Sequence, residues 1–422
     1  MSARIVITDA EERAVLGASR GLASAGYRVC AVARFRPAAT HWSRSCAERV
    51  LLPDPRDSVP AFVEGLKQLL ATGRYSVLLP GSDASLQAIS DHRDRLEPFT
   101  KVGLPPQDVV RSCLDKLALL GAAEAAGLSS PESRSCATRS EAADAAAELG
   151  YPVVLKPVSS FSRSGGGLRQ QGVVVVEDAK ALARVVPDYV PPFLVQRFEH
   201  ASFLSCTGVI ADRRLLALTT SRVPRLWPPV AGMHTFSETV PVPDGLADRA
   251  RRLLNMLGWQ GIFQFQMLES DDGRFSVIDL NPRVFASVTL DARAGANLAA
   301  VWCDWLLGGR PEPVFARPGF RYRWEEGELC HFAWQLRRGR LLAAAAVLAP
   351  HRRVVHAWFR VRDPGPLFAR GLYLAWRSLS NLGRRRPSVD DPGAPDNVGT
   401  PPLQPPPAAS EHAAVVRTGS GR

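Results

Sequence analysis

Short apolar runs and amphipathic helical patterns alternate along the first third of the chain. Residues 4–8 are expected to form a buried strand, residues 14–25 a helix, and residues 27–33 a second strand. This order of strand, helix and strand predicts a parallel, doubly wound α/β sheet. The same alternation continues with expected elements at residues 50–53, 59–70, 75–80 and 84–91.

Polar residues follow the strand expected at residues 75–80. Gly81, Ser82 and Asp83 would lie at the carboxyl end of that strand, where open α/β sheets bind their ligands. Asp83 is therefore a candidate site residue, and the alternative is that it caps the helix over residues 84–91. No G-x-G-x-x-G motif follows the first expected strand, so a dinucleotide site has little support.

An apolar strand expected at residues 153–156 ends at Lys156 and is followed by a glycine-rich segment, residues 161–167. The backbone N–H groups of such a segment can enclose phosphates. The chain has 47 arginines and only five lysines, so a surviving lysine can mark a position that needs a compact ammonium group. The alternative for any one lysine is a solvated surface cation. The small α+β lobe is completed by elements expected at residues 172–176, 179–185 and 193–198.

Candidate metal chemistry lies on a hairpin predicted over residues 262–280. Asp279 and Asn281 are two residues apart, so both side chains lie on the same face of the returning strand. Gln266, on the first strand, can reach the same space. One carboxylate and two amide oxygens, followed by Arg283, suit a hard divalent cation that carries phosphates. The alternative is a strand end with a turn-forming Asn-Pro pair.

The segments around this hairpin are less distinctive. Residues 205–220 predict another hairpin, and residues 221–235 predict a Pro-rich loop that holds Arg222. Helices are expected at residues 115–126, 141–149, 246–257, 298–307, 333–348 and 367–380. From residue 384 onward Pro, Gly, Ala and Ser dominate without periodicity, so a disordered tail is expected.

The net charge of +11 is concentrated in one region of the sequence. Residues 310–386 have 16 arginines against five acidic residues, while residues 1–309 are nearly balanced. This stretch could meet an acidic protein, a phosphorylated substrate, an anionic membrane surface or nucleic acid, and the alternative is a solvated basic surface. Nucleic acid is not favoured, because the sequence has neither an RNA-binding aromatic signature nor a helix-turn-helix pattern.

The seven cysteines are scattered and form no C-x-x-C pair. A disulfide framework and a structural zinc site are therefore not expected, and a reducing cytoplasm fits the composition. Neither a signal peptide nor a transmembrane segment is expected, because no charged leader or long apolar window occurs.

The order of these features resembles the ATP-grasp superfamily, with the closest match to the branch of predicted ATP-dependent carboligases, which are carboxylate–amine ligase-like. The motifs that carry this likeness are Pro80-Gly81-Ser82-Asp83, Asp115-Lys116, residues 151–157 with the glycine-rich segment, residues 193–198, and residues 277–283. The resemblance implies a doubly wound N-terminal domain (1–112) and a two-lobed ATP-grasp domain (113–312). Its small lid lobe would span about 150–200 and its large lobe about 201–312. A basic extension (313–383) and a tail (384–422) would follow.

The resemblance also implies roles for individual residues. ATP would be bound by Lys116, Lys156, Ser162, Ser164, Gly165, Gly166, Gln196, Arg197, Phe198 and Glu199. Mg²⁺ would be held by Gln266, Asp279 and Asn281. Charge on the transferring phosphoryl group would be stabilised by Arg283 and Arg222.

The implied activity is that of an ADP-forming ligase that activates a substrate carboxylate as an acyl phosphate for attack by an amine or similar nucleophile. Its substrates would be small molecules, and a homodimer is one option for its assembly. Gln266 and Asp279 depart from the family pattern, in which a carboxylate and a glutamate are common. One formal charge fewer should weaken metal affinity. The alternative is therefore a catalytically weakened ATP-binding protein that serves as a partner or sensor.

Overall fold

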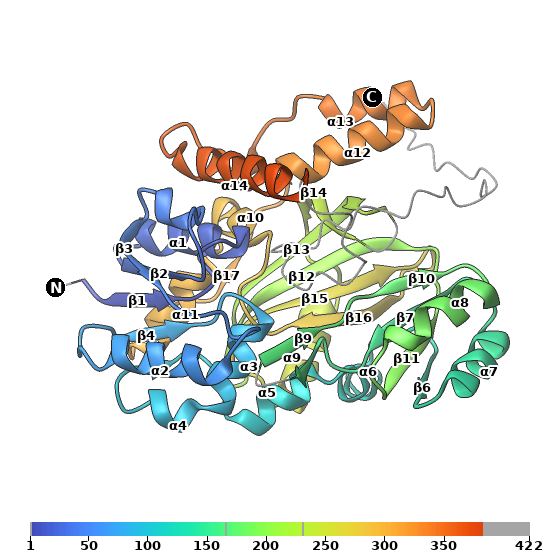
Figure 1. Ribbon diagram of the computed structural model, residues 1–422, viewed down its shortest axis with the longest axis horizontal. Coiled ribbons are helices and arrows are strands. Elements are labelled where there is room, and N and C mark those ends of the chain that lie inside the picture. The colour runs from blue at the N-terminus through green and yellow to red at the C-terminus, as the bar shows by residue number, and fades with distance from the viewer. Residues whose placement is uncertain (1, 165–166, 230–231, 383–422) are drawn as a thin grey trace.

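The computed structural model describes residues 2–164, 167–229 and 232–382 (Figure 1). Its N-terminal part is a five-stranded parallel sheet in the order β3-β2-β1-β4-β5. The strands are β1 (Arg4–Ile7), β2 (Arg28–Ala33), β3 (Cys46–Leu51), β4 (Val77–Leu79) and β5 (Lys101–Val102). The predicted doubly wound sheet is confirmed. The third strand begins before the expected residues 50–53, because an edge strand can alternate buried and exposed positions without an apolar run.

Helices cover both faces of this sheet. In β1, Ile5 and Ile7 belong to the cluster that contains α1, whereas Val6 belongs to the cluster on the other face, as the two-residue period of a strand requires. The helices that pack on the two faces or connect the strands are α1 (Arg13–Ser24), α2 (Val59–Leu70), α3 (Asp83–Asp91), α4 (Arg93–Leu96), α5 (Gln107–Leu114) and α11 (Leu298–Leu306). Buried residues of α11 belong to the same cluster as residues of β1 and of the large sheet, so the two parts share one core.

The small lobe, which we name the lid lobe after its expected role, is a four-stranded antiparallel sheet in the order β10-β7-β11-β6. Its elements are β6 (Ser133–Cys136), α7 (Arg139–Leu149), β7 (Val153–Pro157), β10 (Val174–Val176), α8 (Ala179–Val185) and β11 (Phe193–Arg197). The expected glycine-rich loop is largely a separate hairpin of β8 (Phe161–Ser164) and β9 (Gly167–Gln170). Its predicted tip, Gly165 and Gly166, lies outside the described residues.

The large sheet runs in the order β16-β15-β12-β13-β14-β18-β19, and β17 pairs with β13. Its strands are β12 (Ser202–Ala211), β13 (Arg214–Trp227), β14 (Met233–Val240), β15 (Gly261–Glu269), β16 (Phe275–Asn281), β17 (Val314–Phe315), β18 (Arg321–Arg323) and β19 (Val354–His356). The helices packed near it are α6 (Lys116–Ala125), α9 (Leu246–Met256) and α10 (Val288–Ala294).

The expected Pro-rich loop at residues 221–235 is wrong over most of its length, because β13 continues to Trp227 and β14 begins at Met233. The register between the two strands shifts on either side of Arg225. Pro224 lies at the first of these irregularities, where a residue that cannot donate a ladder hydrogen bond is tolerated.

The C-terminal region adds a helical layer on the outside of the molecule (Figure 1). It consists of α12 (Glu325–Arg337), α13 (Leu341–Leu348) and α14 (Gly365–Leu382). The single helix expected at residues 333–348 is wrong, because the chain breaks at Gly339, which has φ +70°. The expected tail beyond residue 384 lies outside the described residues. Within the described ranges, no helix has the length and apolarity needed to cross a bilayer.

A buried ion pair fastens this layer to the N-terminal sheet. Arg20 Nε lies 2.9 Å from Asp363 Oδ2, and the Ser43 hydroxyl donates to the same oxygen over 2.6 Å. Burial lowers the pKa of Arg20. Burial alone would raise the pKa of Asp363, but hydrogen bonds from Ser43, the Arg44 amide and Arg20, together with the charge of Arg20, hold it below its usual value. Both side chains are thus charged and depend on each other.

Breaking this pair should destabilise the protein. We expect Asp363→Ala to lower the free energy of unfolding by about 3–5 kcal/mol, because it leaves the Arg20 guanidinium buried without its carboxylate. Arg95→Ala, which removes an exposed pair with Glu64, should cost about 1 kcal/mol or less. Urea unfolding of both variants measures this difference. An equal loss of unfolding free energy in the two variants would show that the Arg20–Asp363 pair does not stabilise the contact between the C-terminal layer and the N-terminal sheet.

Candidate functional site

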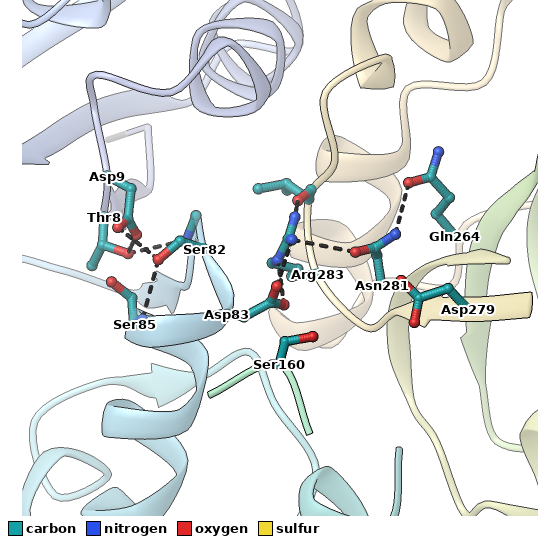
Figure 2. Close-up of polar contacts among 12 residues, drawn as sticks. Thr8, Asp9, Ser82, Asp83, Ser85, Ser160, Gln264, Asp279, Asn281 and Arg283 are labelled. Carbon is teal, nitrogen blue, oxygen red and sulfur yellow. Dashed lines mark hydrogen bonds and ion pairs between the residues drawn. The ribbon is translucent and has the colours of Figure 1, made fainter. Parts of the chain in front are cut away.

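Four elements and the segment after β16 bring charged and amide side chains to one place between the N-terminal sheet and the large sheet. The end of β16 supplies Asp279 and Asn281, and Arg283 follows directly after it. The start of α6 supplies Lys116, β7 supplies Lys156, and α3 supplies Asp83. Figure 2 shows several of these residues around Arg283.

Two buried lysines face one carboxylate. The Asp115 side chain accepts from the amides of Leu117 and Ala118, so it caps α6 and fixes Lys116 in the first turn. Lys116 Nζ donates to Ser160 Oγ over 3.2 Å and lies 3.6 Å from Asp279 Oδ1. Lys156 Nζ donates to the Ile278 carbonyl over 3.0 Å.

The environment of Lys156 disfavours its charged form. Lys156 is 3% exposed, and its pKa is lowered to about 8, first by burial and then by the nearby charge of Lys116, against the opposing effect of Asp279. Two ammonium groups against one carboxylate leave this position with a surplus of positive charge, which an anionic ligand would neutralise.

Arg283 makes a bidentate ion pair with Asp83. Its Nε and Nη2 atoms lie 2.6 and 2.8 Å from the two carboxylate oxygens. Burial opposes both charges, but each partner's charge outweighs that effect, so the pKa of Arg283 is raised and that of Asp83 is lowered. The helix cap is Ser82, whose hydroxyl accepts from the Ser85 amide, so the alternative interpretation of Asp83 as the cap is wrong.

The Asn281 amide is oriented from both sides. Its Nδ2 donates to Gln264 Oε1 over 3.2 Å, and its Oδ1 accepts from Arg283 Nη2 over 3.3 Å. Gln264 in turn donates to Ser205 Oγ over 3.0 Å. Gln264 was not predicted, although the two-residue period of β15 places it on the same face as Gln266.

The candidate metal ligands lie on adjacent strands as predicted. Gln266 is the register partner of Asp279, and Gln264 is the register partner of Asn281. Across the described part of the chain, no three His, Cys, Asp or Glu residues group as a metal site. One carboxylate and two amide oxygens fit a cation that takes its remaining ligands from phosphate and water, as Mg²⁺ does, rather than a closed protein cage.

The side chains of the predicted ATP-binding residues 196–199 make their contacts within the protein, mostly inside the lid lobe. Gln196 Nε2 donates to Ser133 Oγ over 2.7 Å, and Arg197 pairs with Glu132 over 2.6 Å. The Phe198 ring lies edge-on to His200 at 4.9 Å between centroids. Glu199 lies near the charge of Arg274. If this segment contacts a nucleotide, the contact therefore comes from its backbone N–H and C=O groups, or these side chains must first leave their present partners.

Arg222 lies apart from this cluster. It forms a largely exposed pair with Glu269 at 3.2 Å. Its register partner is Leu204, which is buried in the hydrophobic core, whereas the neighbouring Ser205 pairs with Gln266. Alternation along the strand therefore places Arg222 on the face opposite Gln266. The structure does not bring Arg222 to Arg283.

A second polar cluster lies at the carboxyl ends of β1 and β4 (Figure 2). Asp9 has φ +61° and accepts from Thr8 Oγ1 and Ser82 Oγ over 2.5 and 2.7 Å. Beside it, Glu11 pairs with Arg34 over 2.8 Å. Burial, and then the charge of Asp9, raise the pKa of Glu11 to about 7. The signal in the sequence was a run of acids directly after the first strand.

The β8–β9 hairpin is docked onto the N-terminal part. The Leu168 amide donates to the Arg56 carbonyl over 3.0 Å, and Phe161 and Leu168 pack with Ala84. A Cβ atom on Gly167 would lie 2.0 Å from the same Arg56 carbonyl. The close approach of the two backbones therefore requires glycine at this position.

Comparisons with solved structures identify the fold. The chain superposes on the biotin carboxylase domain of Hydrogenobacter thermophilus 2-oxoglutarate carboxylase with a TM-score of 0.60 and 14% identity, over 76% of this chain and 73% of that one. For N5-carboxyaminoimidazole synthetase from Staphylococcus aureus the values are 0.58, 13%, 76% and 80%. For an L-amino acid ligase from Bacillus licheniformis they are 0.56, 16%, 74% and 78%. The chain has the ATP-grasp fold, as the sequence predicted.

Curated relatives are carbamoyl phosphate synthases. The N-terminal section of the large chain from Methanopyrus kandleri is 28% identical over 190 residues, which are 41% of this chain and 32% of that protein. The large chain from Agathobacter rectalis is 25% identical over 328 residues, 73% of this chain and 29% of that protein. The chain thus spans a third or less of the length of these relatives. No protein-family model matches it.

The docking of the hairpin gives a structural prediction. Gly167→Ala should detach β9 from Arg56, because the added carbon cannot fit against the carbonyl. Hydrogen exchange at the Leu168 amide should then be faster by tenfold or more, on the order expected when one backbone hydrogen bond is lost. Gly172→Ala is the matched control, since nothing lies within 4 Å of its added carbon. Unchanged exchange at Leu168 in Gly167→Ala would contradict this docking.

Proposed function

We propose that this protein is an ATP- and Mg²⁺-dependent ligase that activates a substrate carboxylate as an acyl phosphate for attack by an amine. The observation that carries this proposal is the charge arrangement at the end of β16. Lys116 and Lys156 are buried ammonium groups that meet one carboxylate, Asp279. Such a surplus of buried positive charge suits a polyphosphate. The ATP-grasp fold supports the same conclusion.

In this proposal Lys116 and Lys156 bind the phosphates of ATP. The β8–β9 hairpin covers them from the side of Arg56. Ser162 and Ser164 belong to β8 and would contribute backbone N–H groups there. Asp279, Asn281 and Gln266 would hold Mg²⁺, which supplies neutralisation of phosphate charge when bound.

Arg283 stabilises the charge that develops on the transferring phosphoryl group. Its pair with Asp83 holds the guanidinium in one orientation before the ligand arrives. The substrate carboxylate attacks the γ-phosphate, and the bond to the β-phosphate oxygen breaks, so ADP leaves. The amine then attacks the acyl carbon and inorganic phosphate leaves. The docked hairpin keeps water from the acyl phosphate.

Removing either buried lysine should weaken nucleotide binding. We expect Lys116→Met and Lys156→Met each to raise the Kd for Mg·ATP by about tenfold or more, since each removes a charge-assisted phosphate contact. Lys180→Met, which alters an exposed lysine on α8, should leave the Kd unchanged. Titration calorimetry measures all three variants against the parent.

Product analysis tests the reaction itself. With Mg·ATP and a panel of carboxylates and amines, the parent protein should release ADP and phosphate only when a matching carboxylate is present. Release of AMP and pyrophosphate would point to an adenylating enzyme. ATP binding without turnover across the panel would favour the catalytically weakened alternative, which the single carboxylate at Asp279 motivates.

The lowered pKa of Lys156 predicts a pH dependence. In the free protein this lysine loses its proton as the pH rises through about 8, and only the charged form attracts phosphate. The affinity for Mg·ATP should therefore fall by about tenfold between pH 7 and pH 9. Lys156→Arg keeps its charge throughout this range and should bind with a flat pH profile. An equal pH dependence in both proteins would assign the effect to another group.

A further inference from the structure

The sequence from residue 329 to residue 386 is almost free of acidic residues. It contains 12 arginines and a single acid, Asp363. That carboxylate is buried and paired with Arg20, so it offsets no charge at the surface. No acidic residue within this segment therefore offsets its positive charge at the surface.

The three acidic residues on the first turn of α12 also interact with other groups of the protein. Glu325 accepts from the amides of Trp358 and Phe359. Glu326 pairs with Arg370 over 2.7 Å, and Glu328 with Arg225 over 2.5 Å. The arginines that remain exposed are Arg337, Arg338, Arg340, Arg352, Arg353, Arg360 and Arg362.

Large apolar side chains are exposed among these arginines. Of the 21 exposed large hydrophobic residues in the described part of the chain, 12 lie between residues 329 and 379. On α13, Leu341 and Leu342 are 67% and 89% exposed, and between α13 and α14 Val361 is 80% exposed. A concentration of this kind marks an interaction surface rather than the usual scatter of single apolar residues.

The last helix shows the pattern most clearly. Phe368, Leu372, Trp376 and Leu379 follow one another at intervals of four, four and three residues, so they form one stripe along α14. All four are exposed, whereas Tyr373, on the inner side of the helix, is buried. The helix therefore has one apolar face in the protein and a second that meets solvent.

We propose that this C-terminal helical face, made of the exposed residues of α12, α13 and α14 and of residues 359–362, binds the surface of an anionic lipid bilayer. The leucine, phenylalanine and tryptophan side chains would enter the boundary between headgroups and acyl chains, and the arginines would pair with lipid phosphates. Nucleic acid would bind the arginines through its phosphates, but it would not bury Leu342 or the apolar stripe on α14. The three helices form one outer layer (Figure 1).

Vesicle sedimentation with the full-length protein tests this proposal. The protein should sediment with vesicles of about one third phosphatidylglycerol in phosphatidylcholine, and not with pure phosphatidylcholine. Replacing Arg337, Arg338 and Arg340 together with glutamine should weaken binding on the order of 100-fold, at about fivefold for each cation. Gln replacements at the exposed Lys180, Arg184 and Arg214 are the control and should bind as the parent does.

The apolar contribution has its own matched pair. Trp376→Ser should weaken vesicle binding by about tenfold or more, because a large apolar side chain no longer leaves water. Met256→Ser, at a 55% exposed position on α9, should leave binding unchanged.

Four results would overturn the proposal. The first is equal binding to both kinds of vesicle, and the second is no binding to either. The third is a dimer, seen by light scattering, that Trp376→Ser dissociates while vesicles do not bind. The fourth is retention on duplex DNA in the absence of vesicle binding. Nucleotide is absent from these assays, so their outcome is independent of the ligase proposal.

Discussion

The bidentate ion pair between Arg283 and Asp83 is the contact on which the candidate site depends. Asp83 begins α3 at the carboxyl edge of the parallel sheet, and Arg283 follows the last strand of the large sheet, so one ion pair fixes the distance between the two sheets where the ligand would enter. The same guanidinium holds the Asn281 carbonyl oxygen. A partly buried ion pair of this geometry adds little to the free energy of unfolding, but it fixes the orientation of the two side chains. Loss of this pair would misplace Arg283 and Asn281 together.

Unlike Arg283, whose charge is balanced by Asp83, the two buried lysines carry more positive charge than the neighbouring protein groups neutralise. Placing Lys156 beside Lys116 in a buried position costs free energy, which the lowered pKa of Lys156 records. Asp279 offsets part of this cost for both lysines. A polyphosphate would offset the rest, so the surplus of positive charge favours the proposed ligand. In the proposed complex the single carboxylate of Asp279 would have two partners, lysine and metal.

Local patterns predicted most elements and the shared face of the candidate metal ligands, but not the contacts made over long sequence distances. Asp279, Asn281 and Gln266 were predicted to share a face because strand alternation and a tight turn determine register. The partnership of Asp83 with Arg283 spans 200 positions, and no local signal encodes it. Arg222 was misplaced because a strand containing Pro224 looks like a loop, although an irregular register accommodates it. The roles of Gln196 and Arg197 within the lid lobe depend on β6, which the sequence did not reveal.

The C-terminal layer is joined to both walls of the proposed site. Arg20 and Asp363 tie it to the N-terminal sheet, and Arg225 and Glu328 tie it to the large sheet. Figure 1 places this layer on the side of the molecule away from the N-terminal helices α2 and α4, with the lid helices α7 and α8 at the far end. A surface bound through α14 would therefore leave the lid lobe clear. Because the two buried ion pairs lie on the inner side of the layer, binding at its outer face does not have to disturb Asp83 or Arg283, and attachment and catalysis can proceed independently.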